Sequence, residues 1–431
     1  MSNQKSTNVQ KSHIGCYLIK FYSFLCILLA PLIKLYFYSR CLYGKDRFAD
    51  VKNHFGEPTK KRPEGKLIWL HAASIGESTS ALTYINHLLK NHEDLNVLLT
   101  TITVTSADIL SKKLQDNPRC LHQFVVADNP LWVRKFLYYW NPEKAIFLES
   151  EIWPNTINEL HKNQIPTYLL NARLSPRSYK RWSKLRDTFS SLLSKFTKIL
   201  AQSELDKERF ADFSPTNTFK IDNLKYANPK PKVDAELLKT LQTIGQNKKI
   251  FVAASTHEGE EEAIIQVHKL LQKKLDILTI IIPRHLTRID KIQKLLDQNC
   301  INYALRSNLN ENLRPEIICV NTFGEVGTCF ELADVTFVGG SLVPIGGHNI
   351  YEPVMFGKPV LFGSHMDNAL EVKQMLVEKE VAFEVKSSED IAKHCDDFFS
   401  SKDLLNDIQT KAQDATTNNS LQQIDSFITF N

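Results

Sequence analysis

Past residue 45 the chain alternates short β-branched apolar runs with longer amphipathic stretches. This alternation is typical of parallel strands whose crossover helices cover the faces of a sheet. Helical periodicity fills the gaps, for example at 78–89 and 176–196. We therefore expect an α/β protein with strands at Leu67–His71, Val97–Thr103, Ala145–Glu149, Pro166–Leu170, Ile199–Ser203, Ile250–Ala254, Leu278–Ile282, Ile317–Val320, Val335–Val338 and Pro359–Phe362.

A proline-containing stretch, Tyr226–Lys232, interrupts the alternation. Pro229 and Pro231 exclude a helix and a central strand, because proline lacks the backbone N–H. A chain of 431 residues is also longer than one ordinary domain. We predict two Rossmann-like domains that face each other across a cleft, with ligands at the strand ends. The expected parts are an anchor (1–45), a first domain (46–225), a linker (226–233) and a second domain (234–431). The last helices of the second domain could also pack against the first domain.

Residues 14–38 are aromatic and aliphatic, but Lys20, Pro31 and Lys34 interrupt them. The uncharged run 21–33 is shorter than the roughly 20 residues of a spanning helix unless the lysines snorkel. No small-residue cleavage site follows, which favours a membrane anchor, interfacial or spanning, over a cleaved signal peptide. Basic residues follow and predict, by the positive-inside bias, a catalytic body on the cytoplasmic side: Arg40, Lys45, Arg47, Lys52, Lys60, Lys61 and Arg62.

Composition narrows the class of protein. A hydrophobic fraction of 43% and a charged fraction of 23% indicate a folded, mostly water-facing body. The net charge of +5 is too small to argue for nucleic acid and is compatible with anionic substrates or an anionic membrane surface. The eight cysteines form no CxxC pair, so we expect reduced thiols and no zinc or disulfide framework.

Candidate catalytic carboxylates follow two strands of the first half. Glu77 lies in a small-residue loop that opens a helix, where it could take a proton from an attacking hydroxyl. Complementing the helix dipole is an equally consistent role. Glu149 and Glu151 follow a later strand, whose alternation would let at most one face the cleft; a surface pair beside a buried tryptophan is the alternative. Arg173 ends the next strand and is available to an anionic substrate or to one of those glutamates.

The second half repeats the strand-to-helix design. Ser255 and Thr256 offer hydroxyls suited to a phosphate, and Arg284 ends the following strand. The strongest local signal is the glycine-rich stretch 339–352: a helix starting near Ile350 would direct its amides at an anion, and Glu352 could accept from ribose hydroxyls. A purely structural turn is the alternative. P-loop, GxGxxG and Asp-x-Asp patterns do not occur, which disfavours ATPases, NAD dehydrogenases and metal-chelated diphosphate donors.

Together these segments resemble the Kdo (3-deoxy-D-manno-octulosonic acid) transferases of lipopolysaccharide synthesis, inverting enzymes of the GT-B fold type. The resemblance covers nearly the whole chain and rests on many motifs in order: HAASIGE, LESEIWPN, NARLSPRS, AQSELDKERF, DNLK, ASTHEGEEE, IIPRH, NTFGEVGTCFELADVTFVGGS and GGHNIYEP. It implies transfer of Kdo from CMP-Kdo to a lipid A precursor (lipid IVA), without cofactor or metal. It also implies a location at the cytoplasmic face of the inner membrane of a Gram-negative type cell.

The resemblance assigns roles to particular residues. Glu77 corresponds to the general base, and Glu149 or Glu151 with Lys225 correspond to groups that stabilise the transition state. CMP binding is implied for Pro283, Arg284, Gly324, Glu325, Val326, Asn349, Ile350, Tyr351 and Glu352. Further candidates are Ser74, Arg173, Ser255, Thr256 and His348.

Three positions depart from the family pattern: Asp222 replaces a glycine, Ala227 an aspartate and Asn321 an acidic residue. Asp222 is close in sequence to Lys225 and puts that lysine's role in question. The alternatives are another GT-B glycosyltransferase or a nucleotide-sugar epimerase with a different donor, and a binding module without catalysis. The sequence leaves open how many Kdo residues are added and the oligomeric state.

Overall fold

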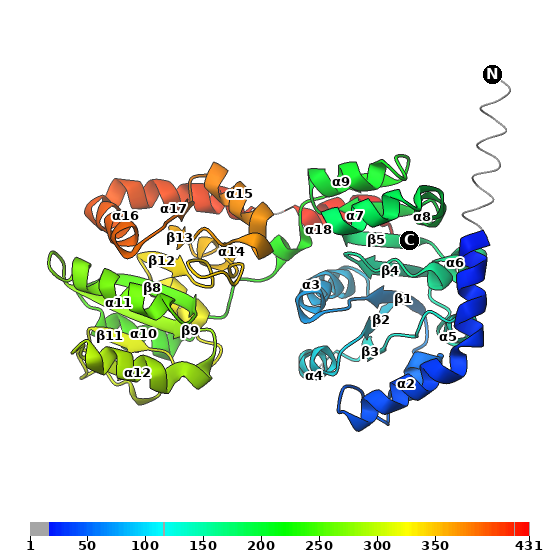
Figure 1. The fold of residues 1–431 in the computed structure, drawn as a ribbon, viewed down its shortest axis with the longest axis horizontal. Coiled ribbons are helices and arrows are strands. Elements are labelled where there is room, and N and C mark those ends of the chain that lie inside the picture. Colours follow the sequence, from blue (N-terminus) through cyan, green and yellow to red (C-terminus); the bar gives the residue numbers. More distant parts are fainter. Residues whose placement is uncertain (1–16, 115–116, 418, 431) are drawn as a thin grey trace, which may run out of the picture. The chain divides into compact units, whose positions relative to one another are not determined.

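Parallel strands form a seven-stranded sheet in each half of the chain, which confirms two Rossmann-like α/β domains (Figure 1). The computed structural model describes residues 17–114, 117–417 and 419–430. Two compact units separate by their internal contacts. Unit 1 holds the chain up to Asn228 together with the C-terminal helix α18, and unit 2 holds Pro229–Thr417.

The sheet of unit 1 has the strand order β3-β2-β1-β4-β5-β6-β7. The order reverses between β1 and β4, and such a switch point leaves the carboxyl ends of both strands uncovered by their helices. The bounds are β1 Lys66–His71, β2 Leu95–Thr101, β3 Cys120–Phe124, β4 Lys144–Leu148, β5 Thr167–Ala172, β6 Lys198–Ala201 and β7 Thr218–Lys220.

The sheet of unit 2 has the order β10-β11-β9-β8-β12-β13-β14, and its switch point lies between β8 and β12. The central strand β8 is buried along most of its length. The bounds are β8 Lys249–Thr256, β9 Ile277–Pro283, β10 Tyr303–Leu305, β11 Ile317–Cys319, β12 Val335–Val338, β13 Val360–Phe362 and β14 Ala382–Glu384.

Helices connect the strands, and many begin at a side chain that accepts a free N–H of the first turn, as Ser74, Thr103 and Ser203 do. Unit 1 contains α2 Ala30–Leu42, α3 Ile75–Asn91, α4 Val104–Lys113, α5 Pro130–Trp140, α6 Pro154–Lys162, α7 Pro176–Ser183, α8 Arg186–Leu193, α9 Glu204–Ala211 and α18 Ser420–Phe427. Unit 2 contains α10 Ala235–Ile244, α11 Glu260–Leu271, α12 Ile289–Gln298, α13 Val326–Leu332, α14 Tyr351–Val354, α15 Leu370–Glu378, α16 Ser388–Ser400 and α17 Lys402–Thr416.

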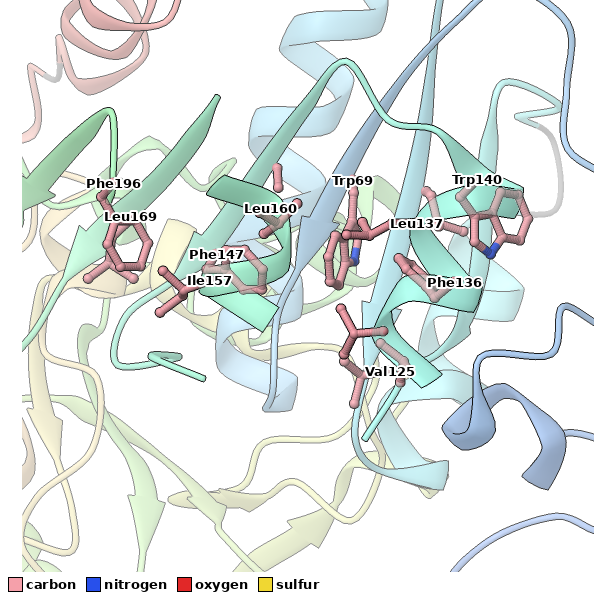
Figure 2. Close-up of a cluster of buried hydrophobic side chains, with 14 of the residues drawn as sticks. Trp69, Val125, Phe136, Leu137, Trp140, Phe147, Ile157, Leu160, Leu169 and Phe196 are labelled. Atoms are coloured by element: carbon pink, nitrogen blue, oxygen red, sulfur yellow. The ribbon is translucent and has the colours of Figure 1, made fainter. Parts of the chain in front are cut away.

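An aromatic cluster packs one face of the unit 1 sheet against α5 and α6 (Figure 2). Trp69 of β1 lies 4.6 Å from Phe136 of α5 and 5.1 Å from Phe147 of β4, measured between ring centroids. Trp69 and Phe147 are both buried. Close-packed aromatic side chains therefore hold the carboxyl ends of β1 and β4. This packing fixes the position of the loops that follow the two strands.

The structure adds four strands to the sequence prediction and changes two of the predicted helices. The short strands β3, β7, β10 and β14 were not predicted; they lie toward the sheet edges, where the apolar signal is weak. The helix expected at 176–196 is broken into α7 and α8 around Leu185, and Trp182 stacks on Phe189 across the break at 4.3 Å. The helix expected near Ile350 is the single turn α14.

The N-terminal segment forms two helices, Tyr17–Leu28 and α2, along the side of unit 1 (Figure 1). Of the described helices, none is by itself long and apolar enough to cross a membrane; these two meet that requirement only as a pair, and the pair is bent by 62°. Phe37 stacks on His54 at 4.1 Å, and the Tyr22 hydroxyl donates to Asp128 at 3.1 Å. The other face exposes large apolar side chains, including Leu28, Leu32 and Leu35.

The C-terminal helix α18 belongs to the core of unit 1, where Ile424 and Ile428 are buried beside the sheet. We predict that Ile424→Ala lowers the free energy of unfolding of unit 1 by about 2–5 kcal/mol, because it leaves a cavity. Gln422→Ala, at an exposed position of the same helix, is the control and should change little. Calorimetric unfolding checks this; a loss confined to unit 2 would contradict it.

Candidate active site

Glu77 lies at the carboxyl end of β1, in the first turn of α3. The carboxylate is 8% exposed and accepts from the Ser74 hydroxyl (2.8 Å) and the Ala73 N–H (2.8 Å), while the Glu77 N–H donates to Ser74 Oγ. This is a variant of the capping box, because the carboxylate bonds the N–H of Ala73, one residue before the N-cap Ser74. Its charge also lies at the helix N-terminus, as the alternative role of complementing the dipole requires. The variant capping box also holds the carboxylate in one orientation at the switch point.

The surroundings of Glu77 make it a stronger base than an ordinary glutamate. Burial raises the pKa of its carboxyl, and the bonds from Ser74 and Ala73 only partly offset this. The negative charges of Glu149 and Glu151 raise the pKa further. A buried carboxylate beside two others is the arrangement expected where a proton has to be accepted.

Glu149 and Glu151 follow β4 but have different partners. The strand ends at Leu148, and Glu149 adopts a left-handed conformation with φ 56°, so strand alternation does not decide where the two side chains point. The Lys225 Nζ lies 2.8 Å from Glu149 Oε1. Glu151 Oε2 accepts from the indole N–H of Trp153 at 2.6 Å and lies 3.4 Å from Nε2 of His71.

Lys225 is positioned by a buried amide network that the sequence analysis did not single out. The Leu224 N–H donates to Asn171 Oδ1 at 2.9 Å, and the Asn171 side chain donates to Gln202 at 3.0 Å. Asp222 does not compete for Lys225: it accepts from the Gln423 side chain at 3.0 Å. An asparagine at the end of an apolar strand, as at 171, was the available sequence signal.

Arg173 braces the same loop through its backbone. Its N–H donates to the Glu149 carbonyl at 3.2 Å, and its carbonyl accepts from the Ser150 hydroxyl at 2.7 Å. The Arg173 side chain is exposed. In unit 1 the structure thus brings Ser74, Glu77, Glu149, Glu151 and Lys225 to one set of strand ends, with Arg173 beside them.

In unit 2, Glu260 at the start of α11 organises the loop after β12. It is fully buried and accepts from the backbone N–H groups of His257, Gly340, Ser341 and Leu342 at 2.7–3.0 Å. These amides are therefore occupied by an internal carboxylate and not free for a phosphate. A Cβ at Gly339 would come within 2.6 Å of Glu260 Oε2, which explains that glycine.

The two hydroxyls predicted after β8 differ. Thr256 is fully buried and donates to Glu261 Oε1 at 3.0 Å, so its hydroxyl has a structural role. Ser255 is half-buried and takes a left-handed φ of 57°. Arg284 follows β9 with an exposed side chain, its N–H bonded to the Thr256 carbonyl at 3.0 Å, and Pro283 beneath it is buried.

Two histidines meet beside these residues. Nε2 of His257 and Nε2 of His348 lie 2.7 Å apart, and the rings stack with an interplanar angle of 7°. Burial, with Arg284 and the neighbouring histidines, lowers the pKa of His348 to about 4, and burial also lowers the pKa of His257. The pair is therefore neutral near pH 7 and shares one N–H between the two nitrogens.

The remaining predicted residues form two loops. Asn349 Oδ1 accepts from the Tyr351 N–H at the start of α14 at 3.1 Å, and its amide donates to Glu352 at 3.0 Å. The side chains of Ile350 and Tyr351 are buried, so these two offer a ligand mainly backbone groups. In the other loop Gly324 is exposed with φ 85°, Glu325 lies 2.9 Å from Arg306, and Val326 begins α13.

The Glu260 cradle gives a stability prediction. Glu260→Ala should destabilise unit 2 by several kcal/mol, because two buried and two part-buried N–H groups lose their acceptor, and each buried one costs about 1–3 kcal/mol. Glu262→Ala, two residues along α11 and exposed, should be close to neutral. Chemical denaturation of both variants checks this, and equal stabilities would contradict the structural role.

Comparison with known proteins identifies the family of this chain. A family model described as 3-deoxy-D-manno-octulosonic-acid transferase (kdotransferase) matches residues 49–228. The 3-deoxy-D-manno-octulosonic acid transferase of Rickettsia bellii is 36% identical, over 87% of this chain and 89% of the relative. The transferase of the same name from Haemophilus influenzae is 32% identical, over 86% of this chain and 88% of that relative.

Among solved structures, a glycosyltransferase from Rickettsia africae aligns with a TM-score of 0.57, over 86% of this chain and 100% of that one. At 15% identity this likeness concerns the fold alone. The curated relatives are similar enough, over enough of their length, to settle the family. The chain belongs to the 3-deoxy-D-manno-octulosonic acid transferases, a family of glycosyltransferases.

Proposed function

We propose that the protein transfers Kdo from CMP-Kdo to a lipid A precursor (lipid IVA), with inversion and with Glu77 as general base. The observation that carries this proposal is the state of Glu77: buried, held by Ser74 and Ala73 at the end of β1, and raised in pKa. Such a carboxylate can remove the proton of an acceptor hydroxyl as its oxygen attacks the anomeric carbon. The bond from that carbon to the CMP phosphate breaks as the new glycosidic bond forms.

Lys225 and Glu149 support this reaction as a pair. The Lys225 side chain is 44% exposed, so its ammonium group keeps capacity for an anion in addition to Glu149. The donor sugar carries a carboxylate and its phosphate leaves as an anion, and a fixed positive charge stabilises such groups as charge develops. We therefore assign transition-state stabilisation to Lys225, with Glu149 orienting it.

We assign the CMP moiety to the strand ends of unit 2. Arg284 supplies an exposed guanidinium, which suits a phosphate. The 346–352 loop adds the neutral imidazole of His348, and Glu352 is half-buried with a pKa raised by burial. Gly324 allows close approach of the 324–326 loop, because its left-handed backbone is exposed. Together these groups can bind one phosphate and a ribose without a metal ion.

We also propose that the helix pair Tyr17–Leu28 and α2 holds the protein at the cytoplasmic face of the inner membrane. Its inner face is bound to unit 1, while Leu28, Leu32 and Leu35 are 61%, 62% and 66% exposed. Lys20 is exposed on the first of these helices and suits an anionic head group. The ammonium group of Lys34 lies over the rings of Phe55 and Trp132 in unit 1.

Catalysis by Glu77 is tested with Glu77→Ala. Loss of a general base should lower kcat for Kdo transfer by about 10²–10⁴-fold. CMP should still raise the melting temperature of the variant as it does for the wild type, because a ligand that binds the native state stabilises it. In the wild type, activity should fall as the pH drops through the raised pKa of Glu77, because only the carboxylate accepts a proton.

Asp390→Ala is the matched control, since Asp390 and Ser387 form a similar capping box at α16. It should leave kcat unchanged. Substantial transfer by Glu77→Ala would remove Glu77 as the base. Stabilisation by uridine nucleotides in place of CMP would instead indicate a different donor.

Membrane attachment is tested by replacing Leu28, Leu32 and Leu35 together with glutamate. Each buried leucine contributes about 1.5–3 kcal/mol, so the variant should lose co-sedimentation with vesicles that contain anionic lipid. The inner face of the helices stays intact, unlike in a deletion of residues 1–45. Leu370→Glu with Val377→Glu, exposed in unit 2, is the control; equal sedimentation of both variants would contradict the proposal.

A further inference from the structure

His71 connects the two loops that carry the glutamates of unit 1. It is the last residue of β1, fully buried, and lies beside β4 in register with Phe147. Its Nδ1 lies 2.9 Å from Thr100 Oγ1 and 3.1 Å from the Thr100 carbonyl. Its Nε2 is buried, forms no hydrogen bond of ordinary geometry within the described part of the chain, and lies 3.4 Å from Glu151 Oε2. One ring thus reaches from β2 to the loop after β4.

The neighbouring contacts decide where the ring proton lies. Thr100 Oγ1 accepts from the indole N–H of Trp69 at 2.9 Å and has two acceptors for its own hydrogen, the Leu70 carbonyl at 3.5 Å and Nδ1 of His71 at 2.9 Å. Nδ1 is the closer one, and when it accepts this hydrogen the proton of the neutral ring is on Nε2, facing Glu151. The Thr100 carbonyl, 3.1 Å from Nδ1, would instead accept from a doubly protonated ring. The other neutral tautomer would place a bare lone pair against a carboxylate. A doubly protonated ring also carries hydrogen on Nε2.

Glu151 is therefore approached by two ring N–H groups on the same oxygen, from His71 and from Trp153. Burial by itself would raise the pKa of Glu151, but the hydrogen bonds and charge of His71 and the Trp153 bond outweigh it and lower the pKa. Glu151 stays ionised, and its charge is one of those that raise the pKa of Glu77. Glu149, by contrast, is paired with Lys225.

We propose that His71 is a positioning residue for Kdo transfer: its Nε2–H fixes the Glu151 carboxylate beside Glu77, while Glu149 with Lys225 meets the reacting groups. The 3.4 Å separation is longer than a typical N–H···O bond, and we expect it to shorten in the substrate complex, as catalytic hydrogen bonds often do. The inference rests on the proposed role of Glu77 as base. It assigns different roles to Glu149 and Glu151, the two glutamates of the LESEIWPN motif.

The test uses two substitutions of His71 in the full-length protein. Asparagine reaches the position of Nδ1 but not that of Nε2, and glutamine places an N–H near the Nε2 position. His71→Asn should lower kcat by about 100-fold with little change in KM, as expected for a displaced catalytic constellation. His71→Gln should recover most of the loss. Unchanged kcat in His71→Asn, or no recovery by glutamine in a protein that melts normally, would overturn the proposal.

A double-mutant cycle with Glu151→Gln distinguishes a positioning role of His71 from a purely structural one. If His71 acts through Glu151, His71→Asn should have little further effect on kcat in the Glu151→Gln background. Additive effects would refute the coupling. Nitrogen-15 NMR of the histidine ring should show a protonated Nε2 whose chemical shift changes in Glu151→Gln, since the carboxylate that it faces is replaced by an amide.

The NMR measurement needs no turnover, so it tests the contact between His71 and Glu151 separately from the proposed function. Coupling between His71 and Glu151 in a protein that does not transfer Kdo would leave this contact standing and remove the proposed function. Normal Kdo transfer by a protein whose His71 Nε2 carries no proton would refute the role of His71 and leave the proposed function standing.

Discussion

Each sheet reverses its strand order at one pair of neighbours, β1 with β4 and β8 with β12. The helices that follow such a pair leave toward opposite faces, so the carboxyl ends of both strands stay open to solvent and ligand. In unit 1 the apolar core lies directly below this opening: Trp69 stands two residues before His71, and Phe147 two residues before Glu149. The polar groups are therefore carried on the most rigid part of the unit, and their geometry depends on that packing.

Glu77 and Glu260 lie in similar local sequences but have different chemical roles. Both follow the first strand of a switch point and stand at the start of a helix. Glu260 is saturated by four backbone N–H groups, so its charge is fully used in holding a loop. Glu77 receives one N–H and one hydroxyl and faces the charges of two other carboxylates. A carboxylate with few donors and like charges nearby gains most from taking up a proton, which is the property a base requires.

The sequence predicts much of the fold because the central strands are continuous apolar runs, as in β12, whose bounds match the prediction at Val335–Val338. It fails at the edges, where strands of three residues such as β7 and β14 carry too little signal. The local sequence pattern could not predict which side chains contact each other. Glu149 meets Lys225, and Glu151 meets His71, across long separations in the chain, and the backbone turn at Glu149 cannot be read from strand alternation. These contacts depend on strand order, which hydrophobic periodicity does not encode.

The departure at Asp222 shows how a local reading can mislead. From spacing alone an aspartate near Lys225 would be expected to draw the lysine away. Instead the Asp222 carboxylate and N–H both bond to Gln423 of α18, while the Leu224 N–H bonds to Asn171. The backbone on the N-terminal side of Lys225 is thus fixed by the C-terminal helix and by β5, and the ammonium group reaches Glu149. Asp222 is thus an attachment point for α18, which strengthens the segment that presents Lys225.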